Sequence, residues 1–123
     1  MKANTSGTSN TAVGRAALLA NTTGTDNIAL GRSALVKNTT GVCNTAVGGQ
    51  NALACNTTGS GNVAIGHNAS CKQTDAGNNV AVGRNSLLCN VSGGNNTAVG
   101  DLSLEMNTAS KNTAVGNQAL EAN

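Results

Sequence analysis

The sequence predicts an all-β chain that winds as a parallel β-solenoid, with about 17 residues in each coil. The main observation is a repeated phrase, N-x-A-V-G-x-x-A-L-x-x-N-T-T-G-x-x, which fills the chain. Its seven copies begin at Asn10, Asn27, Asn44, Asn62, Asn79, Asn96 and Asn112. A fixed period of this length is typical of a repeat architecture, in which each unit buries its apolar side chains against its neighbours. We therefore interpret residues 1–123 as one solenoid domain.

The composition favours a thin rod over a conventional globular core. The 123 residues include no Phe, Tyr, Trp or Pro, and the hydrophobic fraction of 38% is mostly Ala, Val and Leu, so the interior must be narrow. Charged residues make up 10% and the net charge is +2, a field too weak to indicate nucleic acid as a partner. No apolar run has the length of a signal peptide or a membrane span, so we expect no membrane insertion.

Each copy of the phrase contains an Ala and, two residues later, a Gly, and neither varies from copy to copy. We expect the Gly to form a corner that needs positive φ or a close backbone approach, and the Ala to occupy a place where no larger side chain fits. The residues beside the Ala, such as Thr45 and Val47, should point to the opposite face because side chains alternate along a strand. The predicted structural core comprises Ala12, Ala29, Ala46, Ala64, Ala81, Ala98, Ala114, Gly14, Gly31, Gly48, Gly66, Gly83, Gly100 and Gly116.

A second short strand is predicted at the Ala-Leu step of each coil, as at Ala17-Leu18 and Ala34-Leu35. A helix is the competing interpretation, but segments this short cannot hold a helix alone. The NTTG stretch should then turn the chain, since Asn and Gly tolerate left-handed φ. Seven stacked coils would form a rod about 34 Å long, with columns of Asn hydrogen-bonded from coil to coil.

Three stretches, "GNVAIGHNAS" at 61–70, "NNVAVGRNSL" at 78–87 and "DNIALGRSAL" at 26–35, resemble the head repeats of YadA-like trimeric autotransporter adhesins and related repeats of phage tail fibres. The shared residues are the Asn, the central Ala, its aliphatic neighbours and the Gly, and the resemblance covers residues 10–123. It implies a left-handed parallel β-roll, a homotrimer and a surface-exposed adhesive or receptor-binding role. The NTTG loop enlarges this repeat relative to the family pattern.

Two partly apolar columns follow the Leu of each coil and also indicate association. The first contains Leu19, Val36, Ala54, Cys71, Leu88, Glu105 and Glu121, and the second contains Ala20, Lys37, Cys55, Lys72, Cys89, Met106 and Ala122. Because neighbours in a strand face opposite ways, one column must point outward, and either could form a subunit interface. Scattered apolar side chains on the surface of a monomer are the alternative.

Four cysteines, Cys43, Cys55, Cys71 and Cys89, fall in four successive coils. Cys55 and Cys89 share a column but lie two coils apart, roughly 9.6 Å, which exceeds the disulfide limit of about 7 Å between Cα atoms. Cys55 and Cys71 are therefore the pair that suits a disulfide, and free thiols packed as small apolar side chains are the alternative. No C-x-x-C occurs and the single His67 lies in another column, so we predict neither a metal site nor a cofactor.

A variable column follows the corner Gly and reads Arg15, Arg32, Gly49, His67, Arg84, Asp101 and Asn117. We interpret it as solvent-exposed, with Arg15, Arg32, His67 and Arg84 as a possible contact column for a host receptor or glycan. No nucleophile with a base, and no carboxylate pair, recurs at a fixed phase. The chain is therefore predicted not to be an enzyme.

These features favour a non-enzymatic structural rod of a fibre, filament or surface adhesin, located outside the cell, on its surface or in a virion fibre. The partner would be the chain itself, as a homotrimer or as an end-to-end filament. Asn4 and Asn123 are 119 residues apart, which is seven times 17, and this whole number of repeats indicates either head-to-tail stacking or a fragment of a longer repeat array. The alternatives are a receptor-binding head and an ice-binding protein. The ice-binding hypothesis rests on a column of hydroxyls at Thr22, Thr39, Thr57, Thr74 and Thr108.

Overall fold

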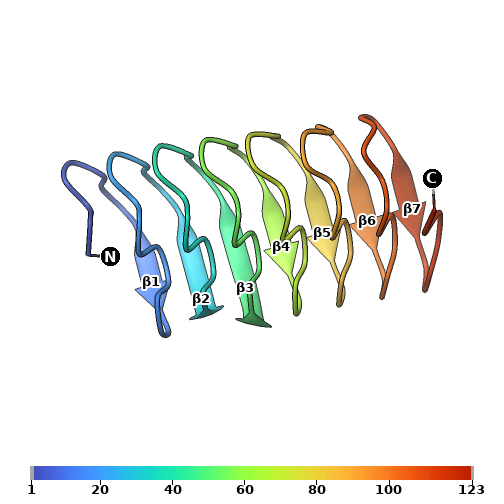
Figure 1. Ribbon diagram of the computed structural model, residues 1–123, viewed down its shortest axis with the longest axis horizontal. Coiled ribbons are helices and arrows are strands. Elements are labelled where there is room, and N and C mark those ends of the chain that lie inside the picture. Colours follow the sequence, from blue (N-terminus) through green and yellow to red (C-terminus); the bar gives the residue numbers. More distant parts are fainter. Residues whose placement is uncertain (1, 123) are drawn as a thin grey trace.

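The computed structural model describes residues 2–122 and forms a β-solenoid with one strand in each coil (Figure 1). The strands are β1 (Thr11–Val13), β2 (Ile28–Arg32), β3 (Thr45–Gln50), β4 (Val63–Ile65), β5 (Val80–Val82), β6 (Thr97–Val99) and β7 (Thr113–Val115). They make a single parallel sheet in chain order, so each coil stacks on its sequence neighbours. No helix occurs within residues 2–122. The predicted all-β parallel solenoid is therefore confirmed.

The interior is one narrow cluster of Ala and Leu side chains. The alanines at the centre of each strand pair with one another in register, from Ala12 with Ala29 to Ala98 with Ala114. Those of β2 to β6 have no exposed surface, and they pack in one cluster with fully buried leucines of the following segments. These leucines are Leu18, Leu35, Leu53, Leu87 and Leu104. Small side chains from the sheet and one Leu from across the coil thus fill the interior.

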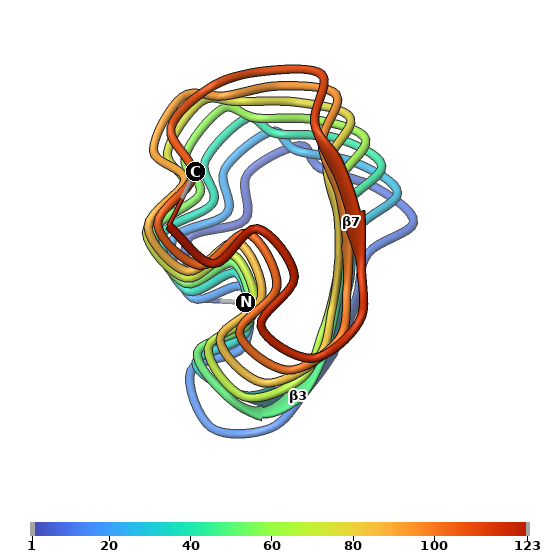
Figure 2. The ribbon, with the colours of Figure 1, turned by 90° about the vertical axis from the view of Figure 1, so that its right-hand side faces the viewer.

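The predicted second strand is wrong, because the Ala-Leu step is a succession of tight turns. In the first coil, the N–H of Ala17 donates to the carbonyl of Gly14 (3.3 Å), and the N–H of Asn21 donates to that of Leu18 (3.4 Å). Ala16 and Leu18 have φ values of 61° and 48°, which lie outside the strand region. Viewed along the axis, these segments lie across the coil from the overlapping strands (Figure 2).

Left-handed φ recurs at the same two positions in every later coil. The pairs are Ser33 and Leu35, Asn51 and Leu53, Asn68 and Ser70, Asn85 and Leu87, Leu102 and Leu104, and Gln118 and Leu120. A non-glycine residue in this region is disfavoured by about 1–2 kcal/mol. Backbone hydrogen bonds to the next coil offset this penalty, since Leu18 donates to Ala34 (3.0 Å) and Ala20 donates to Val36 (3.1 Å). The turns therefore stack as regularly as strands and direct the Leu inward.

Two columns of buried amides tie each coil to the next. The first, the strand ladder, contains Asn10, Asn27, Asn44, Asn62, Asn79, Asn96 and Asn112. From Asn27 onward, the backbone N–H of each residue donates to Oδ1 of the preceding one, as Asn44 does to Asn27 (3.0 Å). The side-chain amide of Asn44 also donates to Asn27 Oδ1 (3.1 Å) and to the carbonyl of Gly59 (2.8 Å). The predicted hydrogen-bonded Asn columns are present.

The second column, the turn ladder, contains Asn4, Asn21, Asn38, Asn56, Gln73, Asn90 and Asn107. Its side-chain amides donate to Oδ1 of the preceding coil along the first four members, at 2.8–2.9 Å. Each of Asn21, Asn38 and Asn56 also donates to the carbonyl of the Gly three residues later, at 3.0 Å. This ladder stops at Gln73, whose amide donates to the carbonyl of Ala76, so Oδ1 of Asn56 is buried without a hydrogen-bond partner. Oδ1 of Asn90 is also buried without a partner, because the amide of Asn107 donates to the carbonyl of Ala109.

The corner after each strand is made by a Gly, and one corner contains the inserted residue. Gly31, like five of its counterparts, has a positive φ (129°), and a Cβ there would collide with the carbonyl of Gly48. Gly48 is not among the positive-φ residues, and the pairing register shifts within β2, between Leu30 and Arg32, so that Arg32 pairs with Gln50. Gly49 is thus the extra residue, and Gln50, not Gly49, occupies the variable corner column.

Candidate functional surfaces

The outer face of the sheet is a surface without charged side chains that extends over all seven strands. Because each central Ala points inward, the residues on both sides of it point outward. We call these two columns the sheet face: Thr11, Ile28, Thr45, Val63, Val80, Thr97 and Thr113 in one, and Val13, Leu30, Val47, Ile65, Val82, Val99 and Val115 in the other. The exposed fraction is 41% for Ile28, 41% for Ile65 and 60% for Val13. No charged side chain belongs to either column.

The sheet face has the shape and chemistry of a protein interface. Six interstrand spacings of about 4.8 Å make it about 29 Å long, and parallel strands with in-register side chains keep it regular. Contiguous apolar surface of this extent, edged by polar residues, marks interaction sites on soluble proteins. The sequence interpretation recognised that these side chains point outward but placed the candidate interface elsewhere. The signal it missed was the absence of charge on both sides of the Ala in all seven copies.

The two columns after the Leu, where the sequence interpretation placed an interface, are less uniform. Leu19 and Met106 are exposed, at 41% and 53%, and Ala54 is buried. Charged residues interrupt both columns, with Glu105 in the first and two lysines in the second. An apolar partner would therefore have to bury charge against this side of the coil, which is unfavourable unless the charge is paired.

The corner column lies at the ends of the strands and is open to solvent. Arg15, Arg32, His67 and Arg84 are all exposed. The guanidinium of Arg84 donates to Oδ2 of Asp101 at 2.8 Å, and this hydrogen bond, with the nearby negative charge, raises the pKa of Arg84. The column is thus a short series of separate polar groups on one corner of the rod.

The threonines of the NTTG turns use their hydroxyl groups inside the chain. The hydroxyl of Thr22 donates to the carbonyl of Thr39, that of Thr39 to Thr57 and that of Thr57 to Thr74, each at 3.0 Å. These bonds make a third connection between successive coils. The hydroxyl protons at these positions are therefore not directed toward solvent, which weakens the turn threonines as an ice-binding surface.

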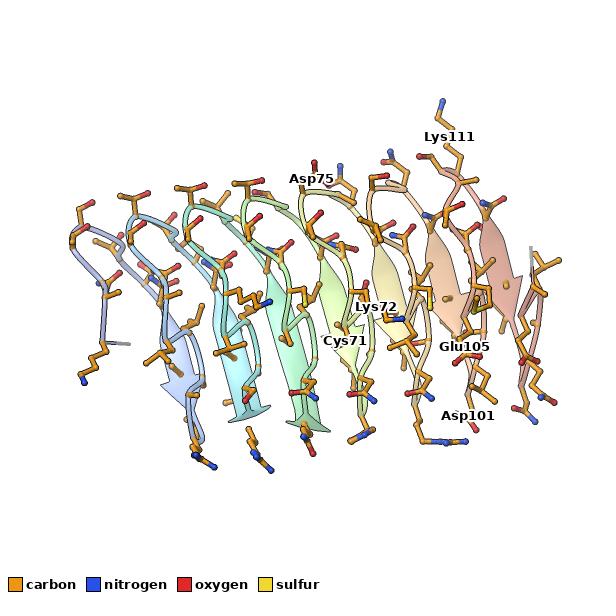
Figure 3. All side chains as sticks on the ribbon, in the orientation of Figure 1. Cys71, Lys72, Asp75, Asp101, Glu105 and Lys111 are labelled. Carbon is orange, nitrogen blue, oxygen red and sulfur yellow. The ribbon has the colours of Figure 1, made fainter. Side chains whose placement is uncertain are left out.

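A cluster of thiols and ammonium groups lies on the turns across the coil from the sheet. Nζ of Lys37 lies 3.9 Å from Sγ of Cys55, and Nζ of Lys72 lies 3.5 Å from Sγ of Cys89. Cys71 directly precedes Lys72 in the chain and lies on the same turns, away from the corner that carries Asp101 (Figure 3). Burial, and then the charge of Cys55, raises the pKa of the Cys71 thiol. All four cysteines are free thiols here, and the Cys55–Cys71 disulfide stays a prediction.

Other kinds of site were also sought over residues 2–122. Within that range, no three His, Cys, Asp or Glu side chains gather as metal ligands. The same residues contain no helix long and apolar enough to cross a membrane, and their surface has no pocket. Comparison of the chain with protein-family models, with curated proteins and with solved structures finds no match.

Proposed function

We propose that the chain is a non-enzymatic structural rod of an extracellular fibre or surface adhesin, and that it assembles with copies of itself through the sheet face. The observation that carries this proposal is the uncharged outer surface that extends over all seven strands. The interior of the coil does not require an uncharged outer face, because the core is already filled by Ala and Leu side chains. An external partner explains why every coil keeps this surface free of charge.

The coil-to-coil bonds support the mechanical part of the proposal. Successive coils are joined by strand pairing, by backbone bonds between the turns, by the strand ladder and by the threonine hydroxyls. These bonds run along the solenoid axis and recur at nearly every joint. A rod held in this way resists bending and stretching, since each repeat is fixed to both of its neighbours.

A second copy of the chain is the partner that best fits the sheet face. The face is long, narrow and uncharged, so two identical copies meet without electrostatic repulsion and in matching register. Burying one exposed Val or Ile contributes about 1.5–3 kcal/mol. Four aliphatic side chains of the sheet face are exposed in each copy, Val13, Ile28, Ile65 and Val115, and the others are half-buried. Three copies arranged around an axis would enclose all three sheet faces, and a homotrimer is also what the resemblance to trimeric adhesins implies.

Sedimentation of two matched variants tests this assembly. Val82→Lys places one charge in the middle of the sheet face, and Leu19→Lys places the same charge on the turns across the coil. We expect a trimer for the parent chain and for Leu19→Lys, and a folded monomer for Val82→Lys. Circular dichroism checks that both variants remain folded. A parent chain that stays monomeric at tens of micromolar would refute self-association, and the reverse response of the variants would move the interface to the turns.

End-to-end stacking is a second mode of assembly for the same rod. β1 and β7 each have a strand partner on one side only, and every coil repeats the same register. Because every coil repeats the same register, the last coil of one copy has the geometry to pair with the first coil of another, and such pairing would generate an open filament. Negative-stain microscopy distinguishes filaments, whose lengths are multiples of one rod, from particles of a single length.

Two alternative functions, receptor binding and ice binding, are tested by separate assays. A receptor-binding head would use the exposed corner column, so binding of the isolated rod to host cells should fall on replacing Arg15 and Arg32 by Ser. Ice binding would need another surface than the turn threonines, whose hydroxyls are bonded internally. Thermal hysteresis at millimolar protein would favour it, with the regular sheet face as the ice-contacting surface.

A further inference from the structure

We propose that Cys55 and Cys71 form a redox-controlled disulfide that ties together the two coils between which the turn ladder stops. This inference is independent of the sheet face and of any assembly through it. Two separate features of the chain coincide at this place: an interrupted ladder inside the coil and a pair of thiols directly outside it.

The interior feature is the loss of one amide–amide hydrogen bond. The turn ladder is continuous from Asn4 to Asn56, but Gln73 then directs its amide to the carbonyl of Ala76 (3.0 Å). Oδ1 of Asn56 consequently has no partner, although its residue has no exposed surface. An unsatisfied buried acceptor is destabilising. This joint is thus weaker than the joints between the preceding coils.

The exterior feature is the position of the two thiols across the same joint. The backbone N–H of Cys55 donates to the carbonyl of Cys71 at 3.1 Å, so the two residues are direct neighbours on consecutive coils. Chains paired in this way lie about 5 Å apart, within the range of about 4.4–6.8 Å that Cα atoms span in disulfides. Both side chains are partly exposed, and an oxidant in solvent can reach them.

The other two cysteines are less suitable partners. Cys43 is exposed and lies directly before a strand, not on the turns after one. Cys89 belongs to the next coil. The backbone N–H that donates to that coil at the residue before it, Leu88, comes from Lys72 and not from Cys71, and the N–H of Cys89 itself donates to Glu105. Neither residue shares a direct backbone hydrogen bond with Cys55 or Cys71 among those of residues 2–122.

The chemistry requires a hydroperoxide as oxidant, for which hydrogen peroxide is the simplest example. The thiolate of Cys55 attacks one peroxide oxygen, the O–O bond breaks, and a sulfenic acid and hydroxide form, the latter taking up a proton to give water. The thiolate of Cys71 then attacks the Cys55 sulfur, an S–S bond forms, the S–O bond breaks and a second water leaves. Two thiols lose two hydrogens and two electrons, and peroxide is reduced to two waters.

The order of these steps follows from the surroundings of the two sulfurs. The sulfur of Cys55 lies 3.9 Å from the ammonium group of Lys37, and we assign Cys55 as the thiol that reacts first. Burial raises the pKa of Cys71, which suits a thiol that reacts second, once its partner has become electrophilic. The resulting bond would join covalently two coils that lack an amide rung.

Peptide mapping and unfolding of the full chain test the proposal. After treatment with hydrogen peroxide, non-reducing digestion should yield one linked pair containing Cys55 and Cys71, with a mass two hydrogens lower. In urea, the unfolding equilibrium constant should fall about 100-fold relative to the reduced chain, as expected for a disulfide that closes a loop of about 17 residues. The variant Cys43→Ser should retain both results, whereas Cys71→Ser and Cys55→Ser should lose both.

Three outcomes would overturn the proposal. One is a link between Cys71 and Cys89, or between two chains, as the main product. Another is a Cys55–Cys71 link that leaves the urea midpoint unchanged. The third is equal stabilisation of the Cys71→Ser variant by peroxide, which would assign the effect to another residue.

Discussion

The interruption of the turn ladder involves two residues that depart from the repeat together, and their coupling can be measured. Ser70 stands where other coils have a buried Leu, and Gln73 stands where they have Asn. The hydroxyl of Ser70 donates to Oε1 of Gln73 at 3.0 Å, and both residues are buried. The longer Gln thus occupies space that the missing Leu leaves, and it supplies the acceptor that the Ser hydroxyl needs. We therefore expect only the double variant Ser70→Leu with Gln73→Asn to restore the regular coil.

The magnitudes follow from the atoms that gain or lose partners. The double variant buries a Leu side chain, worth about 2 kcal/mol, and gives Oδ1 of Asn56 a donor, which relieves a penalty of about 1–3 kcal/mol. Gln73→Asn alone leaves the Ser70 hydroxyl buried without its acceptor, and a cavity beside it. Ser70→Leu alone forces a larger side chain against Gln73, at about 1–3 kcal/mol. Both single variants should therefore be less stable than the parent, and the double variant more stable by about 3 kcal/mol.

Urea unfolding of the four proteins, under reducing conditions so that no disulfide contributes, gives the coupling energy directly. We expect a coupling energy of at least about 2 kcal/mol, favouring the pair. Additive effects, or stabilisation by Gln73→Asn alone equal to that of the double variant, would refute this reasoning. Either result would mean that Ser70 and Gln73 do not depend on each other.

Three further predictions concern the core, the strand ladder and one thiol. Leu53→Ala should lower the free energy of unfolding by about 2–5 kcal/mol, whereas Leu19→Ala, at an exposed position, should change the urea midpoint little. Asn44→Ala should speed amide hydrogen exchange of the Asn62 N–H, because that group donates to Asn44 Oδ1 at 3.0 Å. Since the folded chain raises the pKa of Cys71 above its ordinary value of 9.0, the reduced chain should lose stability as pH rises above that value. The loss should be smaller in Cys71→Ser, and equal pH profiles would contradict it.

Much of the fold could be predicted because the repeat makes each column visible seven times. The spacing of the alanines identified the strand and its inward face, and the recurring Asn identified the ladders. The Ala-Leu step was misassigned because an inward Leu beside outward residues fits a short strand as well as a pair of turns. Left-handed φ at Leu35 or Leu53 is disfavoured locally and arises from hydrogen bonds to adjacent coils. Such tertiary effects leave no local signal in the sequence.

The position of the one-residue insertion illustrates a second limit. The spacing of the repeat places it between Asn44 and Asn62, and the sequence interpretation put Gly49 in the corner column, although Gln50 suits a corner as well. The strand pairing decides, because Arg32 pairs with Gln50. Ser70 and Gln73 are a second such case, because only the hydrogen bond between them shows that these two departures from the repeat act together.

The surfaces of the rod differ in how freely their residues vary, and this difference bears on where partners bind. Residues at the corner and at the turn tips point to solvent, and charges such as Arg15, Asp75 and Lys111 occur there. The sheet face also points to solvent, so a charged side chain on it would meet water and would not disturb the Ala and Leu core. Identical charges stacked at the interstrand spacing of about 4.8 Å would repel one another, which disfavours a fully charged column but not a single charge, and none of the fourteen positions carries even one. The partner proposed above, a second copy with the same uncharged face, would account for this in every repeat.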